Sequence, residues 1–329
     1  MEGVNESKAK LIDIPASEIL DKIQKSEPVE YDHVRIVGNL ELGKLDLPTQ
    51  HIERINFHEE TKLIQSGIKI SNSRIDGETL FISANFLEPV EFSGSTFSED
   101  ADFRNSTFSK DAFFRKSTFS KDAFFKGAIF SKSAHFRKST FSEDADFRDS
   151  TFNGDSDFRD STFSGELLTF RKAIFLNPSS QEDACRRAKI VLESTGDREE
   201  AGYHFYREMD GKRRQKPWYF RYPEFVFIQL IFGYGVHPFR LMACWFGIVF
   251  LFAAIYSLGN GIDATASQLQ VNATLKDYIW FSIATAVTPG YAGYKPTADF
   301  KLVAGLEAIF GTFMWAAFIA TFVRKYMKY

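Results

Sequence analysis

The chain has 329 residues, a formal net charge of −3, 44% hydrophobic residues and 25% charged residues. This length leaves room for two or three domains, and the near-neutral balance argues against a nucleic-acid partner, which would require a basic stripe. The two cysteines, Cys185 and Cys244, are too few for a disulfide framework. The outlying number is 36 phenylalanines. Phenylalanine is not among the common residues of an average domain, and here a repeat and a membrane segment together explain its number.

Residues 1–63 are expected to form an N-terminal cap region. A short amphipathic helix over 16–25 would cover the open end of the segment that follows, because a bare edge of strands invites pairing. The apolar spacing of that next segment already occurs within the cap, at Ile36, Leu42 and Leu47. This leaves open a first coil that begins near Val34 and is interrupted by the stretch 48–62.

Residues 64–176 carry one large apolar side chain at alternating steps of five and six residues, and a small Ala or Ser stands two positions before most of them. The large residues are Ile70, Ile75, Phe81, Phe86, Phe92, Phe97, Phe103, Phe108, Phe114, Phe119, Phe125, Phe130, Phe136, Phe141, Phe147, Phe152, Phe158 and Phe163, and after a step of seven Phe170 and Phe175. Neither a helical period nor simple alternation fits this pattern. A coil with flat sides does fit, with successive coils stacked as parallel strands about 4.8 Å apart.

The spacing resembles pentapeptide repeats, and the resemblance implies their right-handed quadrilateral parallel β-helix. Between residues 92 and 175 the chain holds thirteen acidic and thirteen basic residues. Such a balance is typical of a solvated, salt-bridged surface.

Some proteins with these repeats bind topoisomerases through an acidic, DNA-like surface, and the balanced charge here argues against that role. A cytoplasmic partner of the β-helix therefore stays unidentified.

Residues 177–215 are predicted to form a helical hairpin that links the β-helix to the next domain. Capping-box pairs mark both helix starts, Ser179 with Glu182 and Asp197 with Glu200. The first helix should run over 180–194 and stop at Gly196, since glycine commonly follows the last helical residue. The hairpin is expected to cover the far end of the β-helix.

Residues 216–329 are predicted to form a membrane domain. Two apolar runs, 241–258 and 302–323, would each span about 30 Å as helices, close to the thickness of the hydrocarbon core. The predicted membrane-spanning helices that contain them are 238–258 and 301–324. Inside the second run only Glu307 is charged. The aromatic-rich segment 217–235 is expected to be an interfacial helix. Two buried helices of a soluble protein are the alternative, which the basic flanks of both runs disfavour.

Those basic flanks predict the orientation in the membrane. The residues that precede the first run or follow the second include Lys212, Arg213, Arg214, Lys216, Arg221, Arg240, Arg324, Lys325 and Lys328. The loop between the runs holds only Lys276, Lys295 and Lys301 among basic residues. By the positive-inside rule, the chain is a multi-pass protein of the cell membrane with both termini, and hence the β-helix, in the cytoplasm.

The loop between the runs contains a second, shorter helix signal. Thr274 and Asp277 form a capping-box start, and an apolar helix over 275–287 would be too short to cross a bilayer. It ends in Thr-Pro-Gly-Tyr-Ala-Gly at 288–293. A short helix followed by glycine-rich backbone is typical of a re-entrant pore loop, because irregular backbone is tolerated at membrane depth only where it lines protein or water.

This stretch resembles the pore of two-helix potassium channels, and its fusion to pentapeptide repeats is similar to that of certain prokaryotic proteins. The family reads Phe-Ser, Thr, Thr-Val-Gly-Tyr-Gly-Asp and Pro-Thr, and the corresponding residues here are Phe281-Ser282, Thr285, 288–293 and Pro296-Thr297. The resemblance implies a pore-helix role for Thr285 and a gating hinge at Gly311. It also implies a selectivity filter of Thr288, Pro289, Gly290, Tyr291, Ala292 and Gly293.

Three departures from the family pattern change the filter that is expected. Pro289 replaces Val, so this position keeps its carbonyl but loses its N–H and has a fixed φ. Ala292 replaces a glycine and restricts the backbone. Gly293 replaces Asp and removes a carboxylate from the outer mouth, where Lys295 would add positive charge.

These features predict a homotetrameric ion channel in the lipid bilayer, because one chain supplies a quarter of a filter. The altered filter predicts a weakly selective pore for monovalent cations, K⁺ and Na⁺, with the β-helix serving gating or interaction. Two alternatives stay open: a membrane-anchored scaffold with a non-conducting pore, and an anion-permeable channel favoured by Lys295. The sequence contains no catalytic, nucleotide-binding or metal-ligand motif, so neither an enzyme activity nor a cofactor is expected.

Overall fold

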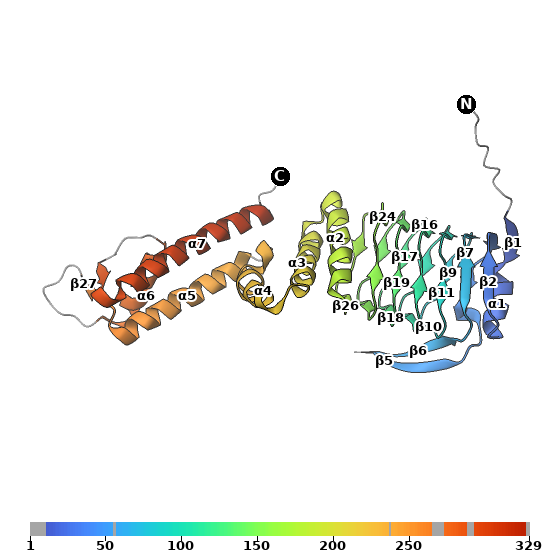
Figure 1. Ribbon diagram of the computed structural model, residues 1–329, viewed down its shortest axis with the longest axis horizontal. Coiled ribbons are helices and arrows are strands. Elements are labelled where there is room, and N and C mark those ends of the chain that lie inside the picture. The colour runs from blue at the N-terminus through green and yellow to red at the C-terminus, as the bar shows by residue number, and fades with distance from the viewer. Residues whose placement is uncertain (1–10, 55–56, 237, 265–272, 288–292, 327–329) are drawn as a thin grey trace, which may run out of the picture. The chain divides into compact units, whose positions relative to one another are not determined.

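The computed structural model describes residues 11–54, 57–236, 238–264, 273–287 and 293–326 (Figure 1). The chain divides into two compact units, Met1–Lys216 and Pro217–Tyr329. Each unit has its own buried apolar cluster.

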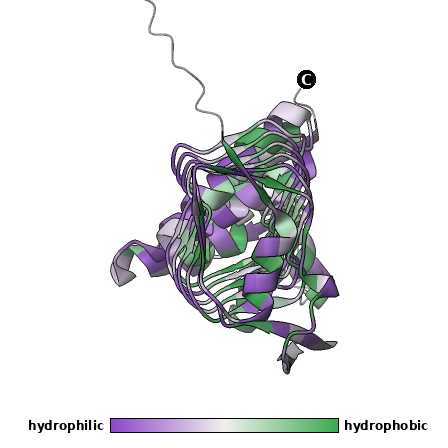
Figure 2. Ribbon diagram, turned by 90° about the vertical axis from the view of Figure 1, so that its right-hand side faces the viewer, coloured by the Kyte–Doolittle hydropathy of each residue, from purple (hydrophilic) through white to green (hydrophobic). Residues whose placement is uncertain are grey.

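The first unit is the four-sided parallel β-helix that the repeat predicts. Strands that share one side pair in register across neighbouring coils, as Phe97 with Phe119 and Phe108 with Phe130 do, a repeat of 22 residues. Viewed along the axis, the coils superimpose as one closed outline (Figure 2). The five-and-six spacing of the sequence therefore corresponds to one side of the coil per step.

Each side of the β-helix is one sheet. One holds β1 (Ile12–Pro15), β3 (Val34–Val37), β8 (Arg74–Ile75), β12 (Thr96–Phe97), β16 (Thr118–Phe119), β20 (Thr140–Phe141) and β24 (Thr162–Phe163). The next holds β2 (Val29–Asp32), β7 (Ile68–Ser71), β11 (Val90–Glu91), β15 (Ala112–Phe113), β19 (Ala134–His135) and β23 (Ser156–Asp157). A third holds β4 (Leu40–Glu41), β9 (Thr79–Leu80), β13 (Ala101–Asp102), β17 (Ala123–Phe124), β21 (Ala145–Asp146) and β25 (Leu168–Thr169). The last holds β5 (Thr49–Arg54), β6 (Phe57–Ile64), β10 (Ala84–Phe86), β14 (Thr107–Phe108), β18 (Ile129–Phe130), β22 (Thr151–Phe152) and β26 (Ile174–Phe175).

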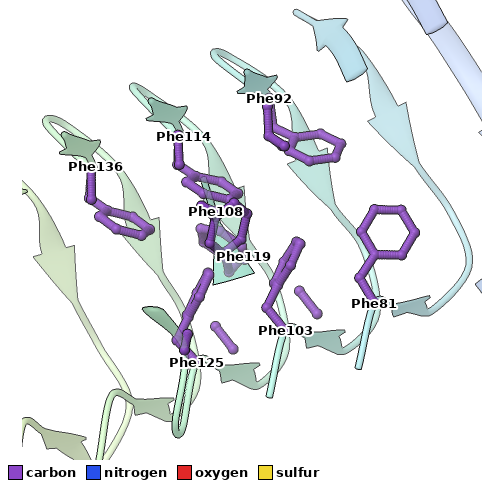
Figure 3. Packing of buried hydrophobic residues seen from close by; sticks show 14 of the residues in the cluster. Phe81, Phe92, Phe103, Phe108, Phe114, Phe119, Phe125 and Phe136 are labelled. Carbon is purple, nitrogen blue, oxygen red and sulfur yellow. The ribbon is translucent and has the colours of Figure 1, made fainter. Parts of the chain in front are cut away.

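The phenylalanines fill the inside of the coils. Figure 3 shows Phe92, Phe114 and Phe136 in one row and Phe103 and Phe125 in another. Rings one coil apart lie nearly parallel: the centroids of Phe103 and Phe125 are 5.0 Å apart with an interplanar angle of 5°. Offset aromatic pairs at such distances add to the gain from burial, so the core is a set of stacked rings.

The small inward serines have a polar role that their size alone does not predict. The Ser117 hydroxyl donates to the Phe92 carbonyl at 2.8 Å, and the Ser161 hydroxyl donates to the Phe136 carbonyl at 2.6 Å. These bonds link adjacent coils from within the core. They satisfy buried hydroxyls whose burial would otherwise be costly.

The outer surface is salt-bridged, as the balanced charge predicts. Arg104 pairs with Asp102 at 2.5 Å and Arg148 with Asp146 at 2.6 Å, each pair on one strand edge. A second set of aspartates bonds to backbone instead: Asp100 Oδ1 accepts from the N–H of Asp122 at 3.2 Å. Asp122 Oδ1 accepts in turn from the N–H of Asp144, one coil further on, at 3.1 Å. These carboxylates therefore tie the coils together.

Two irregularities interrupt the coils. Strands β5 and β6 pair antiparallel and form an insertion after the first coil. They account for most of the stretch 48–62, which interrupts the apolar spacing in the sequence. In the last coil the register moves by one residue, since Ala145 pairs with Leu168, 23 positions away. The slip from six to seven in the sequence corresponds to this extra residue.

The N-terminal end of the β-helix is closed by α1 (Ala16–Gln24), whose buried side chains include Ala16, Ile19 and Ile23. The strand β1, which was not predicted, lies outside the first coil and pairs in parallel with β3. Its backbone N–H and C=O groups pair with those of β3, whose edge would otherwise be open at this end of the β-helix.

The C-terminal end is closed by α2 (Pro178–Thr195) and α3 (Arg198–Arg214). Side chains of α3 bond to the last coil where a further strand would pair. The Phe170 N–H donates to His204 Nε2 at 2.9 Å, and the Lys172 N–H donates to the Tyr203 hydroxyl at 2.9 Å. Arg207 Nη1 donates to the Ala173 carbonyl at 2.5 Å.

The capping prediction for α2 was wrong at its first residue. Asn177 is the N-cap, and its Oδ1 accepts from the Ser179 N–H at 2.8 Å. Pro178 then occupies the first helical position, where its missing N–H costs nothing. The other signals are confirmed: Gly196 follows α2 with φ of +84°, and Asp197 Oδ1 accepts from the Glu200 N–H at 3.1 Å.

The second unit begins with three short helical segments in place of the single interfacial helix predicted over 217–235. They are α4 (Trp218–Pro223), the π-helical η2 (Glu224–Ile231) and η3 (Gly233–Gly235). Tyr234 adopts a left-handed φ of +51° inside η3, which breaks the helix there. All four aromatic side chains of α4 are exposed, Trp218 by 72%.

Three helices form the body of the second unit: α5 (Pro238–Gly259), α6 (Leu275–Val287) and α7 (Lys301–Tyr326). They pack against one another in all three pairs. Short elements join them, β27 (Ile262–Ala264), β28 (Tyr294–Pro296) and η4 (Ala298–Phe300). By length and composition, α5 and the span Ala298–Val323 could each cross a membrane.

Candidate functional site

The short helix α6 begins at the capping box that the sequence predicts. Asp277 Oδ2 accepts from the Thr274 backbone N–H at 2.8 Å and from the Thr274 hydroxyl at 2.6 Å. The helix then runs for 13 residues, about 20 Å, which is too short to cross a bilayer.

Aromatic side chains hold α6 against the other two helices. The ring of Phe281 meets the ring of Tyr256 edge-on, with centroids 5.1 Å apart and an interplanar angle of 83°. Tyr278, Ala253 and Ala304 belong to the same buried cluster, so all three helices contribute to it. A helix that cannot span the membrane is thereby buried between two that could.

A polar contact joins the same three helices. Glu307 of α7 accepts a hydrogen bond from the Tyr256 hydroxyl of α5 at 2.7 Å, and its other carboxyl oxygen contacts the Ser282 hydroxyl of α6. The Ser282 Oγ also lies 2.8 Å from the Val249 carbonyl of α5. Sequence reasoning named Ser282 only as part of the pore motif and Glu307 only as a charge inside the second apolar run. It missed Tyr256, because no sequence spacing links the three residues.

Two family models match the chain. A model of pentapeptide repeats, nine copies, matches residues 81–129 and 125–174. A model of the ion channel family matches residues 241–328, a range that includes most of α5 and all of α6 and α7. The chain joins pentapeptide repeats to an ion channel domain. No curated protein and no solved structure is significantly similar to it.

In the ion channel domain, α7 continues without interruption through the predicted hinge, Gly311. Gly311 is buried, and a Cβ added there would overlap the backbone of Ala286 near the end of α6. The structure therefore explains this glycine by the close approach of two helices. A hinge at Gly311 stays a prediction.

The β27–β28 pair of the ion channel domain sets a carboxylate opposite Lys295. β27 and β28 pair antiparallel, and Asp263 lies directly across from Lys295 in their register. Both side chains are exposed, and directly opposite side chains in such a ladder have Cβ atoms about 5 Å apart. Sequence reasoning counted only the lysines of this loop and missed Asp263, whose partner is set by the pairing.

Five of the six predicted filter residues, Thr288, Pro289, Gly290, Tyr291 and Ala292, lie outside the described residues. The sixth, Gly293, is exposed with φ of +80°, a conformation that favours glycine. Thr285, predicted to act in the pore helix, lies buried in α6, and its hydroxyl has no hydrogen-bond partner among the residues that the structure describes. Their roles in an ion path stay predictions.

Within those same described ranges, no group of three or more His, Cys, Asp or Glu side chains is placed to hold a metal ion. The two cysteines are free, and burial raises the pKa of the Cys185 thiol to about 12. A thiol with so high a pKa is a poor nucleophile at neutral pH.

Proposed function

We propose that four copies of the chain assemble around one axis as a channel for monovalent cations. The observation that carries this proposal is α6, a short helix buried between two membrane-capable helices and ending at Val287, directly before the Thr-Pro-Gly-Tyr-Ala-Gly segment. The C-terminal end of a helix carries partial negative charge. Four such ends around one axis would favour a cation near it.

The same proposal assigns the pore a weak preference for K⁺ over Na⁺. Selection of K⁺ needs successive backbone carbonyls that replace the water around the ion. Pro289 and Ala292 restrict the backbone dihedrals at two of the positions that would supply them. The row of carbonyls is therefore expected to differ from that of a K⁺-selective filter.

The charge at the β27–β28 pair favours a cation pore over an anion pore. Lys295 would attract anions if it stood alone, but Asp263 faces it across the β27–β28 pair. Opposite charges at this separation largely offset each other. The positive ring that supported an anion-permeable channel is thus weakened.

For gating, we propose that α7 moves at or near Gly311 and that the cytoplasmic β-helix biases this movement or binds a partner. The surface of the β-helix carries paired charges, as between Arg104 and Asp102. This arrangement suits recognition by shape more than capture of a strongly charged ligand.

Ion flux from liposomes that contain the purified chain tests the proposal. A tetramer by mass measurement, together with a cation leak absent from empty liposomes, is the expected result. Leu251→Ala is a matched control, because Leu251 on α5 is 57% exposed and should leave the flux unchanged. A stable monomer, or a tetramer without ion leak, would favour the membrane-anchored scaffold instead.

A further inference from the structure

Three polar side chains from three different helices meet inside the ion channel domain. Tyr256 of α5 and Ser282 of α6 are fully buried, and Glu307 of α7 is 1% exposed. Aromatic and small apolar residues surround them, including Phe281 and Ala253. No ion pair of Glu307 with a lysine, arginine or histidine occurs in the described part of the chain. An unpaired carboxylate in such surroundings would be strongly disfavoured.

The number of hydrogen bonds around Glu307 can be compared with the number of protons available to form them. Among the described residues, three contacts run through Glu307 and Ser282: Tyr256 Oη to Glu307 Oε2 at 2.7 Å, Glu307 Oε1 to Ser282 Oγ, and Ser282 Oγ to the Val249 carbonyl at 2.8 Å. Each contact needs one proton, and the two hydroxyls supply only two. With an ionised Glu307, the single proton of Ser282 would have to serve two acceptors. A proton on Glu307 Oε1 completes the set, because Glu307 then donates to Ser282 and Ser282 donates to Val249.

We infer that Glu307 is a protonated carboxylic acid and the positioning residue of α6. In this arrangement Tyr256 donates to Glu307, Glu307 donates to Ser282, and Ser282 donates to Val249. The chain of hydrogen bonds runs from α5 through α7 to α6 and back to α5. It fixes all three helices without placing a net charge in the apolar interior.

The contact between Gly311 and Ala286 completes the positioning. Glu307 and Gly311 lie one turn apart on α7, and their partners Ser282 and Ala286 lie one turn apart on α6. A slide or rotation of α7 would have to break the hydrogen bond and the backbone contact together. The end of α6, from which the predicted filter starts, is therefore held by α7. The effect of Glu307 on ion flux rests on the proposed channel function, whereas its protonation state does not.

Infrared spectroscopy of the full chain in lipid tests the protonation state directly. At pH 7.5, exposed Asp and Glu are ionised because their ordinary pKa values are about 4. The C=O band of a protonated carboxylic acid should therefore be visible in the wild type and absent from Glu307→Gln. The same band intensity in both proteins would overturn the inference, whether or not the chain conducts ions.

Flux from liposomes tests the positioning role. In Glu307→Gln the amide can donate to Ser282 and accept from Tyr256, so flux per tetramer should stay within about twofold of the wild type. Glu307→Leu leaves both hydroxyls without this partner, and flux should fall by about tenfold or more. Leu251→Ala serves as the control on an exposed face of α5.

Two results would contradict the positioning role. Equal losses in Glu307→Gln and Glu307→Leu would mean that the negative charge itself is needed, and full activity of Glu307→Leu would mean that the contact does not position α6. If Glu307→Leu fails to assemble, Glu307→Gln still decides between the neutral and the charged residue. Absence of flux in the wild type would count against the proposed channel alone, since the infrared result stands apart from it.

Discussion

At the scale of single residues, the repeat separates a buried face from an exposed one. Phe125 is fully buried between Phe103 and Phe147, with ring centroids 5.0 and 4.9 Å away. Phe125→Ala should therefore lower the free energy of unfolding by about 3–5 kcal/mol. Lys121 is exposed and pairs with the equally exposed Glu143 at 3.9 Å, so Lys121→Ala should cost less than about 0.5 kcal/mol. Chemical denaturation followed by circular dichroism measures both changes. Equal losses of stability would mean that the wrong side chains of the repeat have been assigned to the core.

A single histidine is expected to make the C-terminal cap sensitive to acid. Burial lowers the pKa of His204 to about 3, and its Nε2 accepts from the Phe170 N–H. In the unfolded chain this histidine binds a proton below a pH of about 6.5, whereas in the folded chain it stays neutral. The free energy of unfolding should therefore fall as the pH drops from about 6.5 toward 3, by at most about 1.4 kcal/mol per pH unit.

Denaturation midpoints between pH 7 and pH 4 would measure this loss. Aspartates with lowered pKa, such as Asp157 beside Arg159, add an acid dependence of their own at the lower end of this range. The comparison is therefore with His204→Gln, which should show a shallower pH dependence. Identical slopes in the two proteins would rule out His204 as the cause.

The inward direction of the phenylalanines spaced five and six residues apart could be predicted, because that period leaves one consistent buried face. The bonding partners of the other residues could not. Ser117 bonds to a carbonyl 25 residues earlier, and His204 bonds to a backbone N–H 34 residues earlier. Such pairs depend on how coils and helices stack, which no local pattern contains.

At the scale of elements, two glycines of α7 should behave in opposite ways. A Cβ at Gly311 would overlap the backbone of Ala286, whereas a Cβ at Gly305 meets nothing within 4 Å. Gly311→Ala should separate α6 from α7 and reduce both thermal stability and ion flux. Gly305→Ala should be neutral or stabilise the helix by up to about 1 kcal/mol, since alanine favours helix. Comparable losses in both variants would show that the close contact at Ala286 is not what requires Gly311.

Element boundaries were predictable where local chemistry decides them. Thr274 and Asp277 mark the start of α6, and Gly196 marks the end of α2. The prediction of the N-cap of α2 failed because two capping residues lie close together, Asn177 and Ser179. Asn177 is the N-cap, because Pro178 is well suited to the first helical position that follows it. Prediction failed also for β1, because that strand forms only by pairing with β3.

At the scale of the whole molecule, the basic flanks predict which side of the membrane holds each unit. In a variant with Cys244 replaced by alanine, a cysteine at the exposed position Lys110 of the β-helix should be shielded from an impermeant thiol reagent in intact cells. A cysteine at the exposed position Lys276, between the two spans, should be labelled. The remaining native cysteine, Cys185, is buried. The reverse labelling pattern would place the β-helix outside the cell.

The two-part architecture was readable from the sequence because each part has a strong period of its own, a ladder of phenylalanines and two long apolar runs. The three-helix contact at Glu307 was not, since its partners Tyr256 and Ser282 come from separate helices 51 and 25 residues away. Selectivity could be predicted least well, because in the proposed channel it would depend on the positions of backbone carbonyls within 288–293.

The ion preference of the reconstituted chain tests the proposed channel most directly. Currents in planar bilayers are measured with K⁺ on one side and Na⁺ on the other, and then across a gradient of KCl. The proposal predicts a reversal potential near zero with K⁺ and Na⁺, and one that follows the cation in the gradient. Pro289→Val combined with Ala292→Gly should shift the first potential toward that of K⁺. A strong K⁺ preference in the wild type, a potential that follows chloride, or no current from an assembled tetramer would contradict a weakly selective cation pore.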